Sequence, residues 1–266
     1  MKDSYFIIDS HCHIYPKKIV DRAVPATDAF YNVKSFCRGT VEDLLIKGDE
    51  AGIDRFLVQS VATTPKQVKS INTFIANEVA AHPDKLTGLG TLHPDSEDQA
   101  GDVEHLIGLG LKGVKLHPDI QNFDIDDPRC IKIYELCKDR LPILMHTGDN
   151  RYDHSNPNRL LPVLRQFPDL TVIGAHFGGW SIWEEASKAY CDLDNLFVDC
   201  SSSFYCLTKE KAREIIERYG VDKVMFATDY PMWSPEKELE FFLSLGFTKE
   251  ENEKMLSGNA RKIFGI

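Results

Sequence analysis

Residues 143–147 read ILMHT and residues 171–176 read TVIGAH, two short β-rich runs that both carry a histidine at their end. Between them, Asn156-Pro157 places a helix-capping residue before a proline that suits a first helical turn. A strand, a helix and a second strand in this order predict a parallel pair joined by a right-handed crossover.

The same unit recurs along the whole chain. Further helix starts are predicted at Thr64-Pro65, Asp127-Pro128 and Ser234-Pro235. The β-rich runs are Tyr5 to His11, Arg55 to Ser60, Leu86 to Leu92, Gly113 to His117, Ile143 to Thr147, Thr171 to His176, Leu196 to Cys200 and Lys223 to Thr228. Eight strands that alternate with helices favour an α/β fold closed as a (β/α)8 barrel, with an open doubly wound sheet as the alternative.

Length and composition agree with one soluble domain over residues 1–266. The chain is close to the ~250 residues typical of such a barrel, and 42% of its residues are hydrophobic and 27% charged. Its net charge of -10 disfavours nucleic acid and anionic membranes as partners. No apolar run approaches a signal or membrane segment, so we expect a cytoplasmic protein. The seven cysteines lack paired spacing and are expected to be reduced.

Two segments lie outside the eight units. Residues 17–38, between the first strand and its helix, are longer than an ordinary connection and predict a loop that caps the pocket. Residues 248–266 predict a C-terminal helical extension across the outside or bottom of the barrel.

Metal-ligand residue types stand at the ends of most predicted strands, where the chemistry of a parallel barrel is located. His11 and His13 are two apart on an extended chain and share a face, whereas Cys12 should point away from them. His146, His176 and Asp229 end three further strands. Single buried histidines usually bond to backbone carbonyls, but four histidines and one aspartate at one mouth favour a divalent metal. Zn2+ suits this donor set best, and Mn2+, Fe2+ or Co2+ are acceptable.

Six segments, taken together, resemble the amidohydrolase superfamily, specifically the amidohydrolase-2 branch of TIM-barrel metal-dependent hydrolases. They are DSHCHIYP at 9–16, GVKLHPDIQ at 113–121, ILMHTGD at 143–149, VIGAHFGG at 172–179, VMFATDYP at 224–231 and SGNARKIF at 257–264. The resemblance covers nearly the whole chain. The branch includes aminocarboxymuconate-semialdehyde decarboxylase, resorcylate decarboxylases, lactonases, hydratases and true hydrolases.

The resemblance implies roles for individual residues. His11, His13, His146 and Asp229 would bind one metal, and His176 would act beside it as a catalytic group. A bound divalent ion lowers the pKa of its water towards ~7, and Asp229 would hold that water and shuttle its proton.

Lys115 and His117 both face inward by alternation and leave a second arrangement open. A carboxylated Lys115 would bridge a second metal, with His146 and His176 shared between the two sites, as in binuclear relatives. The alternative is an ion pair between Lys115 and a nearby carboxylate.

Substrate contacts are predicted from the loops that follow the strands. Arg151 is the candidate to bind a substrate carboxylate, because its planar guanidinium matches two oxygens, although a solvated loop charge is an equal alternative. Trp180 and Trp233 are expected as apolar walls, with Phe30, Tyr31 and Phe36 from the first loop.

The leading functional prediction is a metal-dependent hydrolase of a small amide, ester or lactone. The alternative is a non-oxidative decarboxylase of a carboxylated arene or enol acid, which needs the same ligands. A metal-binding protein without catalysis is disfavoured because no ligand position is missing. A TatD-like nuclease is disfavoured by the acidic charge balance. The expected partner is a small molecule, one that carries a carboxylate if Arg151 has the predicted role, and homo-oligomers are common among such enzymes.

Overall fold

The computed structural model describes residues 5–266 and confirms the closed barrel. Its strands are β1 Ile8–His13, β2 Arg55–Gln59, β3 Leu86–Gly88, β4 Gly90–Thr91, β5 Val114–Leu116, β6 Ile143–Met145, β7 Val172–Gly174, β8 Leu196–Asp199 and β9 Val224–Met225. All pairs of neighbouring strands are parallel. β3 and β4 together correspond to the single strand predicted at Leu86 to Leu92, interrupted at Leu89. The barrel therefore has the eight strand positions that the sequence indicates.

The barrel closes between its first and last strands. The Ser10 amide donates to the Phe226 carbonyl at 3.0 Å, and Cys12 forms a parallel bridge with Tyr230. The buried carboxylate of Asp9 reinforces the seam, because it accepts hydrogen bonds from the amide and the hydroxyl of Thr228. The residue that follows Thr228 is Asp229, which is thereby held close to β1.

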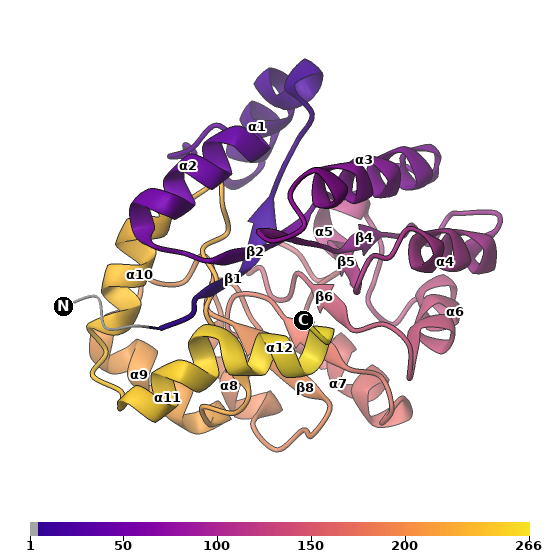
Figure 1. The fold of residues 1–266 in the computed structure, drawn as a ribbon. Coiled ribbons are helices and arrows are strands. Elements are labelled where there is room, and N and C mark those ends of the chain that lie inside the picture. Colours follow the sequence, from indigo (N-terminus) through magenta and orange to yellow (C-terminus); the bar gives the residue numbers. More distant parts are fainter. Residues whose placement is uncertain (1–4) are drawn as a thin grey trace.

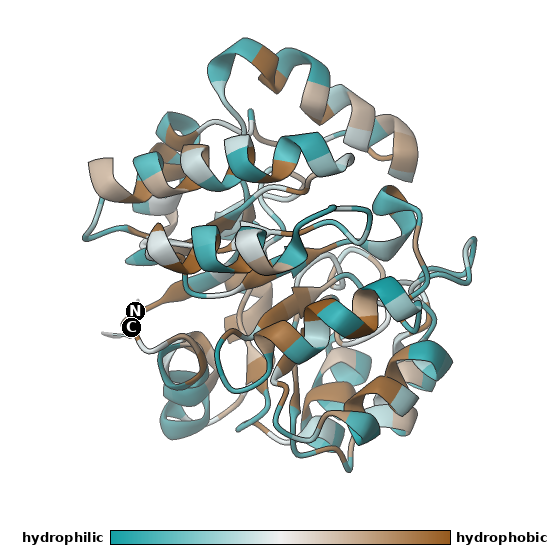
Figure 2. Ribbon diagram, turned by 90° about the vertical axis from the view of Figure 1, so that its right-hand side faces the viewer, coloured by the Kyte–Doolittle hydropathy of each residue, from teal (hydrophilic) through white to brown (hydrophobic). Residues whose placement is uncertain are grey.

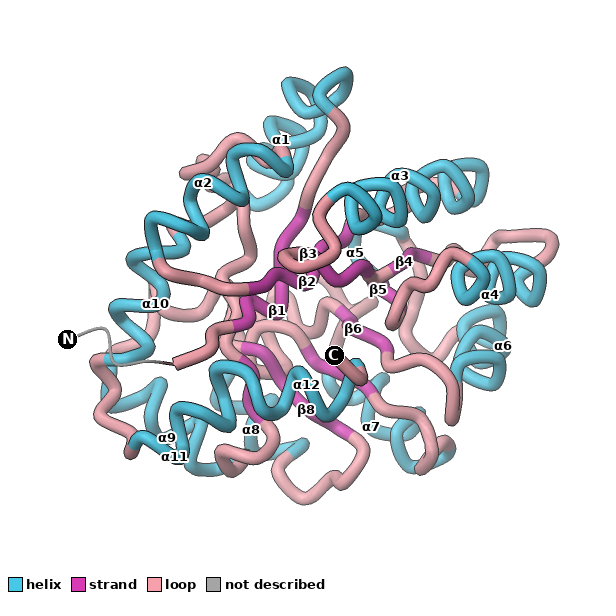
Figure 3. The backbone as a smooth tube through the Cα atoms, in the orientation of Figure 1, coloured by secondary structure: helices cyan, strands magenta, loops and turns pink. Residues whose placement is uncertain are grey.

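Helices surround the strands as an outer ring (Figure 1, Figure 3). They are α1 Lys17–Tyr31, α2 Val41–Ala51, η1 Pro65–Gln67, α3 Val68–Ala81, α4 Gln99–Gly108, α5 Pro118–Gln121, α6 Pro128–Cys137, α7 Pro157–Gln166, α8 Trp183–Tyr190, α9 Lys209–Tyr219, α10 Pro235–Leu243, α11 Lys249–Glu253, η2 Lys254–Gly258 and α12 Asn259–Phe264. Helical elements start at Pro65, Pro128, Pro157 and Pro235, as the sequence predicts. Figure 2 shows these helices striped in teal and brown around brown strands, the pattern of helices that bury one face.

Two apolar cores separate the inside of the barrel from its helices. The inner core fills the end of the barrel where the strands begin. Ala260 and Phe264 of α12 pack against this core and close that end of the barrel. The outer core lies between strands and helices and contains Cys12. Cys12 therefore points away from the barrel interior, as alternation predicts.

Residues 17–38 differ from the expected loop. Most of the segment is the helix α1, which buries only Val20 and contains Pro25 in its interior. The helix persists because its last turn is anchored elsewhere: the Arg151 guanidinium donates to the Phe30 carbonyl at 2.6 Å. No helix among residues 5–266 combines the length and apolar character that a membrane span requires.

Candidate metal centre

The two histidines of β1 reach the barrel interior through an irregularity in the strand. β1 has one extra residue between Asp9 and Cys12 relative to β2, as in a β-bulge. The bulge lets Ile8, at the bottom, and His11, near the mouth, both face inward although they are three residues apart. Strict alternation alone would have placed them on opposite faces.

His176 and Asp229 occupy an unusual backbone conformation. Their φ angles are 60° and 61°, in the left-handed region that non-glycine residues seldom adopt. Such residues cost about 1–3 kcal/mol each and concentrate at functional sites. Here the left-handed turns direct both side chains into the mouth of the barrel, where they line the same cavity.

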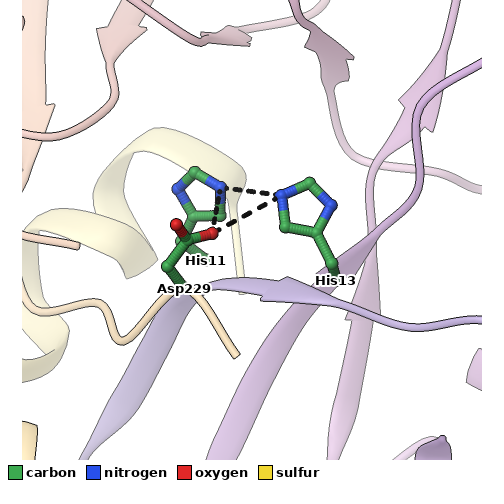
Figure 4. Close-up of side chains that lie close together, drawn as sticks. All are labelled: His11, His13 and Asp229. Carbon is green, nitrogen blue, oxygen red and sulfur yellow. Dashed lines mark hydrogen bonds and ion pairs between the residues drawn. The ribbon is translucent and has the colours of Figure 1, made fainter. Parts of the chain in front are cut away.

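His11, His13 and Asp229 converge on one point (Figure 4). The Nε2 atoms of the two histidines lie 3.1 Å apart, and Asp229 Oδ1 lies 3.4 Å and 3.6 Å from them. One ligand atom from each residue falls within 4.8 Å of the others. Two nitrogens and one carboxylate oxygen at this spacing form a candidate site for a divalent cation.

His176 lies beside His11 of this cluster, and His146 lies beside His176. His146 Nδ1 is 3.0 Å from His176 Nε2, and the His176 ring stacks on His11 with centroids 5.4 Å apart. All five residues that the sequence singles out thus line one cavity, but only His11, His13 and Asp229 form a group at ligand distance. His146 instead falls in a second such group, with His117 and Asp119.

The outer nitrogens of these rings are held by further polar groups. His11 Nδ1 donates to Asp199 Oδ2 at 2.8 Å, and His176 Nδ1 donates to the Ser201 carbonyl at 2.9 Å. His146 Nε2 lies 3.6 Å from Asp119 Oδ2. Because an oxygen acceptor fixes the proton on the outer nitrogen, the inner lone pairs of His11 and His176 face the centre of the site.

Burial sets the charge of the cluster. It lowers the pKa of His13 and His146 well below the ordinary value and that of His176 to about 4, so these rings are neutral at pH 7. Although burial opposes ionisation of Asp199, the His11 and His176 rings hold the pKa of that carboxyl low. The same balance lowers the pKa of Asp229. The site thus offers neutral imidazoles and anionic carboxylates, the protonation states that metal ligands need.

Unpaired polar atoms at His146 and Asp119 also bear on whether these side chains fit a cation. Buried His146 Nε2 and Asp119 Oδ1 have no hydrogen-bond partner among residues 5–266. If His146 carries its proton on Nδ1, towards His176, the lone pair of Nε2 is left facing the Asp119 carboxylate. If Nδ1 were to hold a cation, His146 would have to carry its proton on Nε2, on the side of Asp119. A divalent metal would therefore favour the His146 tautomer that directs an N–H towards Asp119.

Lys115 and His117 have separate environments. Lys115 is buried, its Nζ donates to His11 Nε2 at 3.1 Å, and burial lowers its pKa to about 8. His117 accepts from the Ile120 amide at Nδ1 and bonds Tyr31 through Nε2 at 2.6 Å. His117, Asp119 and His146 are also close enough to form a ligand group, but both ring nitrogens of His117 already have partners.

A cavity of about 860 Å³ opens above the cluster and is lined by all five predicted metal-site residues, Lys115 and His117. Phe30 and Tyr31 form part of its wall. Trp180 and Trp233 instead line a small neighbouring cavity of about 20 Å³, which also touches His146, His176 and Asp229. Phe36 is 59% exposed and lines neither cavity.

Arg151 lies outside the lining of both cavities. Its Nε and Nη2 donate to the two oxygens of buried Asp149, and Nη1 donates to the Phe30 carbonyl. The guanidinium also lies over the rings of Tyr31 and Trp180, at 5.4 and 5.3 Å from the ring centroids. The structure thus assigns the predicted carboxylate-binding donors of Arg151 to an anchor between the β6 loop and α1.

A family model described as amidohydrolase, of the Amidohydro_2 type, matches residues 8–266. The chain belongs to this amidohydrolase family. The match spans every strand and thus all of the residues that converge at the barrel mouth.

Named proteins similar to this amidohydrolase include decarboxylases. A 2-amino-3-carboxymuconate-6-semialdehyde decarboxylase of Dictyostelium discoideum is 23% identical over 97% of this chain and 84% of its own length. The crystal structure of 5-carboxyvanillate decarboxylase from Sphingomonas paucimobilis has a TM-score of 0.78 at 18% identity and covers 99% of this chain and 100% of its own. A 5-carboxyvanillate decarboxylase from Novosphingobium aromaticivorans, complexed with manganese, has the same TM-score at 16% identity and covers 100% of this chain and 97% of its own.

Sequence reasoning missed three residues of the amidohydrolase site. Asp199 and Ser201 hold the outer nitrogens of His11 and His176, and Asp119 lies 3.6 Å from the outer nitrogen of His146. None of the three is predicted from the sequence. A signal existed for Asp199, since this acidic residue stands in a run otherwise apolar, LFVDC at 196–200. A buried carboxylate at a strand end beside predicted ligands needs a partner, and an outer imidazole nitrogen is one.

Proposed function

We propose that this amidohydrolase is a metal-dependent decarboxylase that releases CO2 from a carboxylated arene or enol acid without oxidation. The named relatives support this alternative more than the hydrolysis of an amide, ester or lactone that the sequence favours. Both reactions use the same donor set, so the proposal depends on what else surrounds it.

The observation that carries the proposal is the charge of the cavity. Among the described residues that line it, Asp229 is the only carboxylate, whereas Lys115 lies buried at its base beside the histidines. Phe30, Tyr31 and Met232 supply apolar walls. Near the histidines, such a cavity suits an apolar substrate that brings its own carboxylate, because an uncompensated anion is costly against the apolar walls.

His11, His13, His146 and Asp229 would hold the metal. When bound, a divalent cation supplies positive charge that orients the substrate's oxygen atoms and stabilises the negative charge that develops during the reaction. Zn2+ is the cation expected from the sequence, and the manganese in the Novosphingobium enzyme supports Mn2+ equally, since both accept nitrogen and oxygen donors.

The position of His176 makes it the candidate to deliver the proton that replaces CO2 on the substrate carbon. Cleavage of the bond to the carboxylate leaves an electron pair on carbon, and one proton must replace the CO2 that departs. His176 keeps Nδ1–H bound to the Ser201 carbonyl, so Nε2, which lies 3.0 Å from His146 Nδ1, is the nitrogen that would carry that proton. Because its pKa is lowered to about 4, His176 is neutral at pH 7, so Nε2 would first take up a proton from a substrate hydroxyl or from solvent and then pass it to the carbon.

The test measures CO2 release from hydroxylated benzoates, 5-carboxyvanillate and 2-amino-3-carboxymuconate semialdehyde, with the enzyme loaded with Mn2+ or Zn2+. In D2O, NMR should show one deuteron at the carbon that lost the carboxylate. His176→Gln and Asp229→Asn should each slow release by about 100-fold or more, whereas His154→Gln, at a histidine paired with Asp124 away from the cavity, should not. Turnover of lactones or amides without CO2 would replace the proposal with hydrolysis. Metal binding without turnover of either panel would remove it.

A further inference from the structure

The cavity is larger than a single-ring acid requires. Its volume of about 860 Å³ lies near the upper end of the 300–1,000 Å³ range of pockets that enclose drug-sized ligands. A benzoate at the metal centre would leave most of this space unfilled.

The extra space lies between α1 and α3. Tyr31, in the last turn of α1, bonds His117 at the barrel mouth, while the first turns of α1 lie away from the strands at the top of Figure 1. Residues of α1 from Lys18 to Phe30 line the cavity. At 1.5 Å per residue, these twelve steps extend the cavity about 18 Å along the helix. We call this part, between α1 and α3, the outer groove.

The walls of the outer groove are mostly apolar, with Ser70, Thr73 and Asn77 of α3 among the polar residues in the lining. α1 contributes Ile19, Ala23 and Ala26, which share one face because they are four and three residues apart. α3 contributes Ile71 and Phe74 from the opposite side. An apolar groove continuous with the candidate active site is a place for an apolar part of the substrate.

The far end of the groove is positive. Lys18 and Arg22 are one helical turn apart, both line the cavity, and neither has an ion pair with any residue in the range 5–266. No carboxylate among the described lining residues offsets them except Asp229, at the base. Both side chains are exposed and, within the described part of the chain, unpaired, in a protein whose net charge is -10.

We propose that the outer groove binds the distal part of an elongated substrate, with an apolar body along α1 and a second anionic group held by Lys18 and Arg22. Counted from Phe30, Arg22 and Lys18 lie about 12 and 18 Å along the helix, a span that suits an elongated substrate. The inference rests on the proposed function for the identity of the reacting end, and it adds the substrate class.

The test uses isothermal titration calorimetry at pH 7 with the metal-loaded full chain and three probes. They are benzoate, benzoate with a para alkyl chain of about eight carbons, and the same molecule with a carboxylate at the chain end. Because each buried methylene contributes up to ~4-fold in affinity, the alkyl probe should bind at least about 100-fold more tightly than benzoate. The terminal carboxylate should add about 10-fold.

Variants separate the groove from general effects. Lys18→Gln with Arg22→Gln should remove the gain from the terminal carboxylate alone. Lys34→Gln with Arg38→Gln makes the same charge change at exposed residues outside the cavity lining and should leave it intact. Ala23→Trp should fill the groove and abolish the gain from the chain while benzoate still binds.

The outcomes distinguish the two proposals. Equal affinity for all three probes, or a dianion gain that survives in the Lys18/Arg22 variant, overturns the outer groove even if CO2 release is observed. Tight binding of the long dianion that depends on Lys18 and Arg22 supports the groove even if no acid is decarboxylated, in which case the proposed reaction fails alone.

Discussion

The two ends of the barrel interior are built from the same strands and hold opposite kinds of side chain. Where the strands begin, the interior is apolar and closed by α12; this end contains Ile8, Leu57, Leu89, Leu144, Ile173, Phe197, Met225, Ala260 and Phe264. Where they end, it contains His11, His13, Lys115, His146, His176, Asp199 and Asp229. Inward-facing positions therefore serve packing at one end and chemistry at the other.

One step of alternation separates the two ends. Leu144 and His146 follow each other on the inner face of β6, and Phe197 and Asp199 do so on β8. Two residues along a strand are about 7 Å. Because burial of apolar area stabilises the fold while burial of ionisable groups costs free energy, we expect stability and metal binding to separate over this distance.

The largest effect should come from paired substitutions on β6. Leu144→Ala, in the inner core, should cost about 3 kcal/mol in the free energy of unfolding and leave metal content unchanged. His146→Asn should lower the metal content to less than about a tenth of wild type, with a much smaller loss of stability in the metal-free protein. Elemental analysis and urea unfolding of both variants measure the two quantities.

The comparison breaks if both variants lose metal and stability in parallel. That result would mean that the two layers fold as one unit and that the mouth contributes to the stability of the barrel.

The closure by α12 should matter almost as much as Leu144. Phe264 is buried against the inner core, so Phe264→Ala should cost about 3 kcal/mol without changing metal affinity. Lys262→Ala on the exposed side of the same helix is the control. A change in metal affinity in Phe264→Ala would show that the bottom of the barrel is coupled to its mouth.

The sequence predicts the parts of the site that depend on local signals. Each strand is a short β-rich run, and parallel strands bring their ends to one mouth, so the sequence alone places His146, His176 and Asp229 together. The spacing of His11 and His13 likewise requires only alternation.

The sequence does not predict contacts between residues far apart in the chain. Nor does it predict a helix that forms against its local propensity because tertiary contacts stabilise it. The bond from His11 to Asp199 spans 188 residues, and its register depends on the bulge in β1. α1 was expected to be a loop, and it contains Pro25, which disfavours an isolated helix. Contacts of its last turn with Arg151 and His117 override that preference. The same contacts explain why Arg151 lies outside the cavity.

A moderate effect is expected at Asp199, which lies two residues after Phe197 on the same face of β8. Asp199→Asn keeps the shape of the side chain but removes the charge that orients His11, and should lower metal affinity about 10- to 100-fold. Competition with a chelator for Zn2+ or Mn2+ measures it, with exposed Asp192→Asn as the control. Unchanged affinity would show that His11 keeps its orientation without the carboxylate.

The smallest effect concerns Glu238, a buried carboxyl of α10. Burial, with Asp9 and Asp229 nearby, raises its pKa from 4.5 to about 8. Between these two values the unfolded state binds fewer protons than the folded state, so this group makes stability fall as pH rises from about 5 to 8. Glu238→Gln should remove about 1–2 kcal/mol of that fall, measured by urea unfolding of the metal-free protein at pH 5 and pH 8.

Exposed Glu236→Gln on the same helix should leave the pH dependence of wild type unchanged. Because Asp9 and Asp229 are present in every variant, the difference between the two glutamine variants isolates Glu238. If the two variants have the same pH dependence, Glu238 is ionised in the folded protein, and the acidic groups behind the mouth are better solvated than their burial indicates. Burial of an ionisable group at the mouth would then cost less free energy than the comparison of the two barrel ends assumes, at least for Glu238.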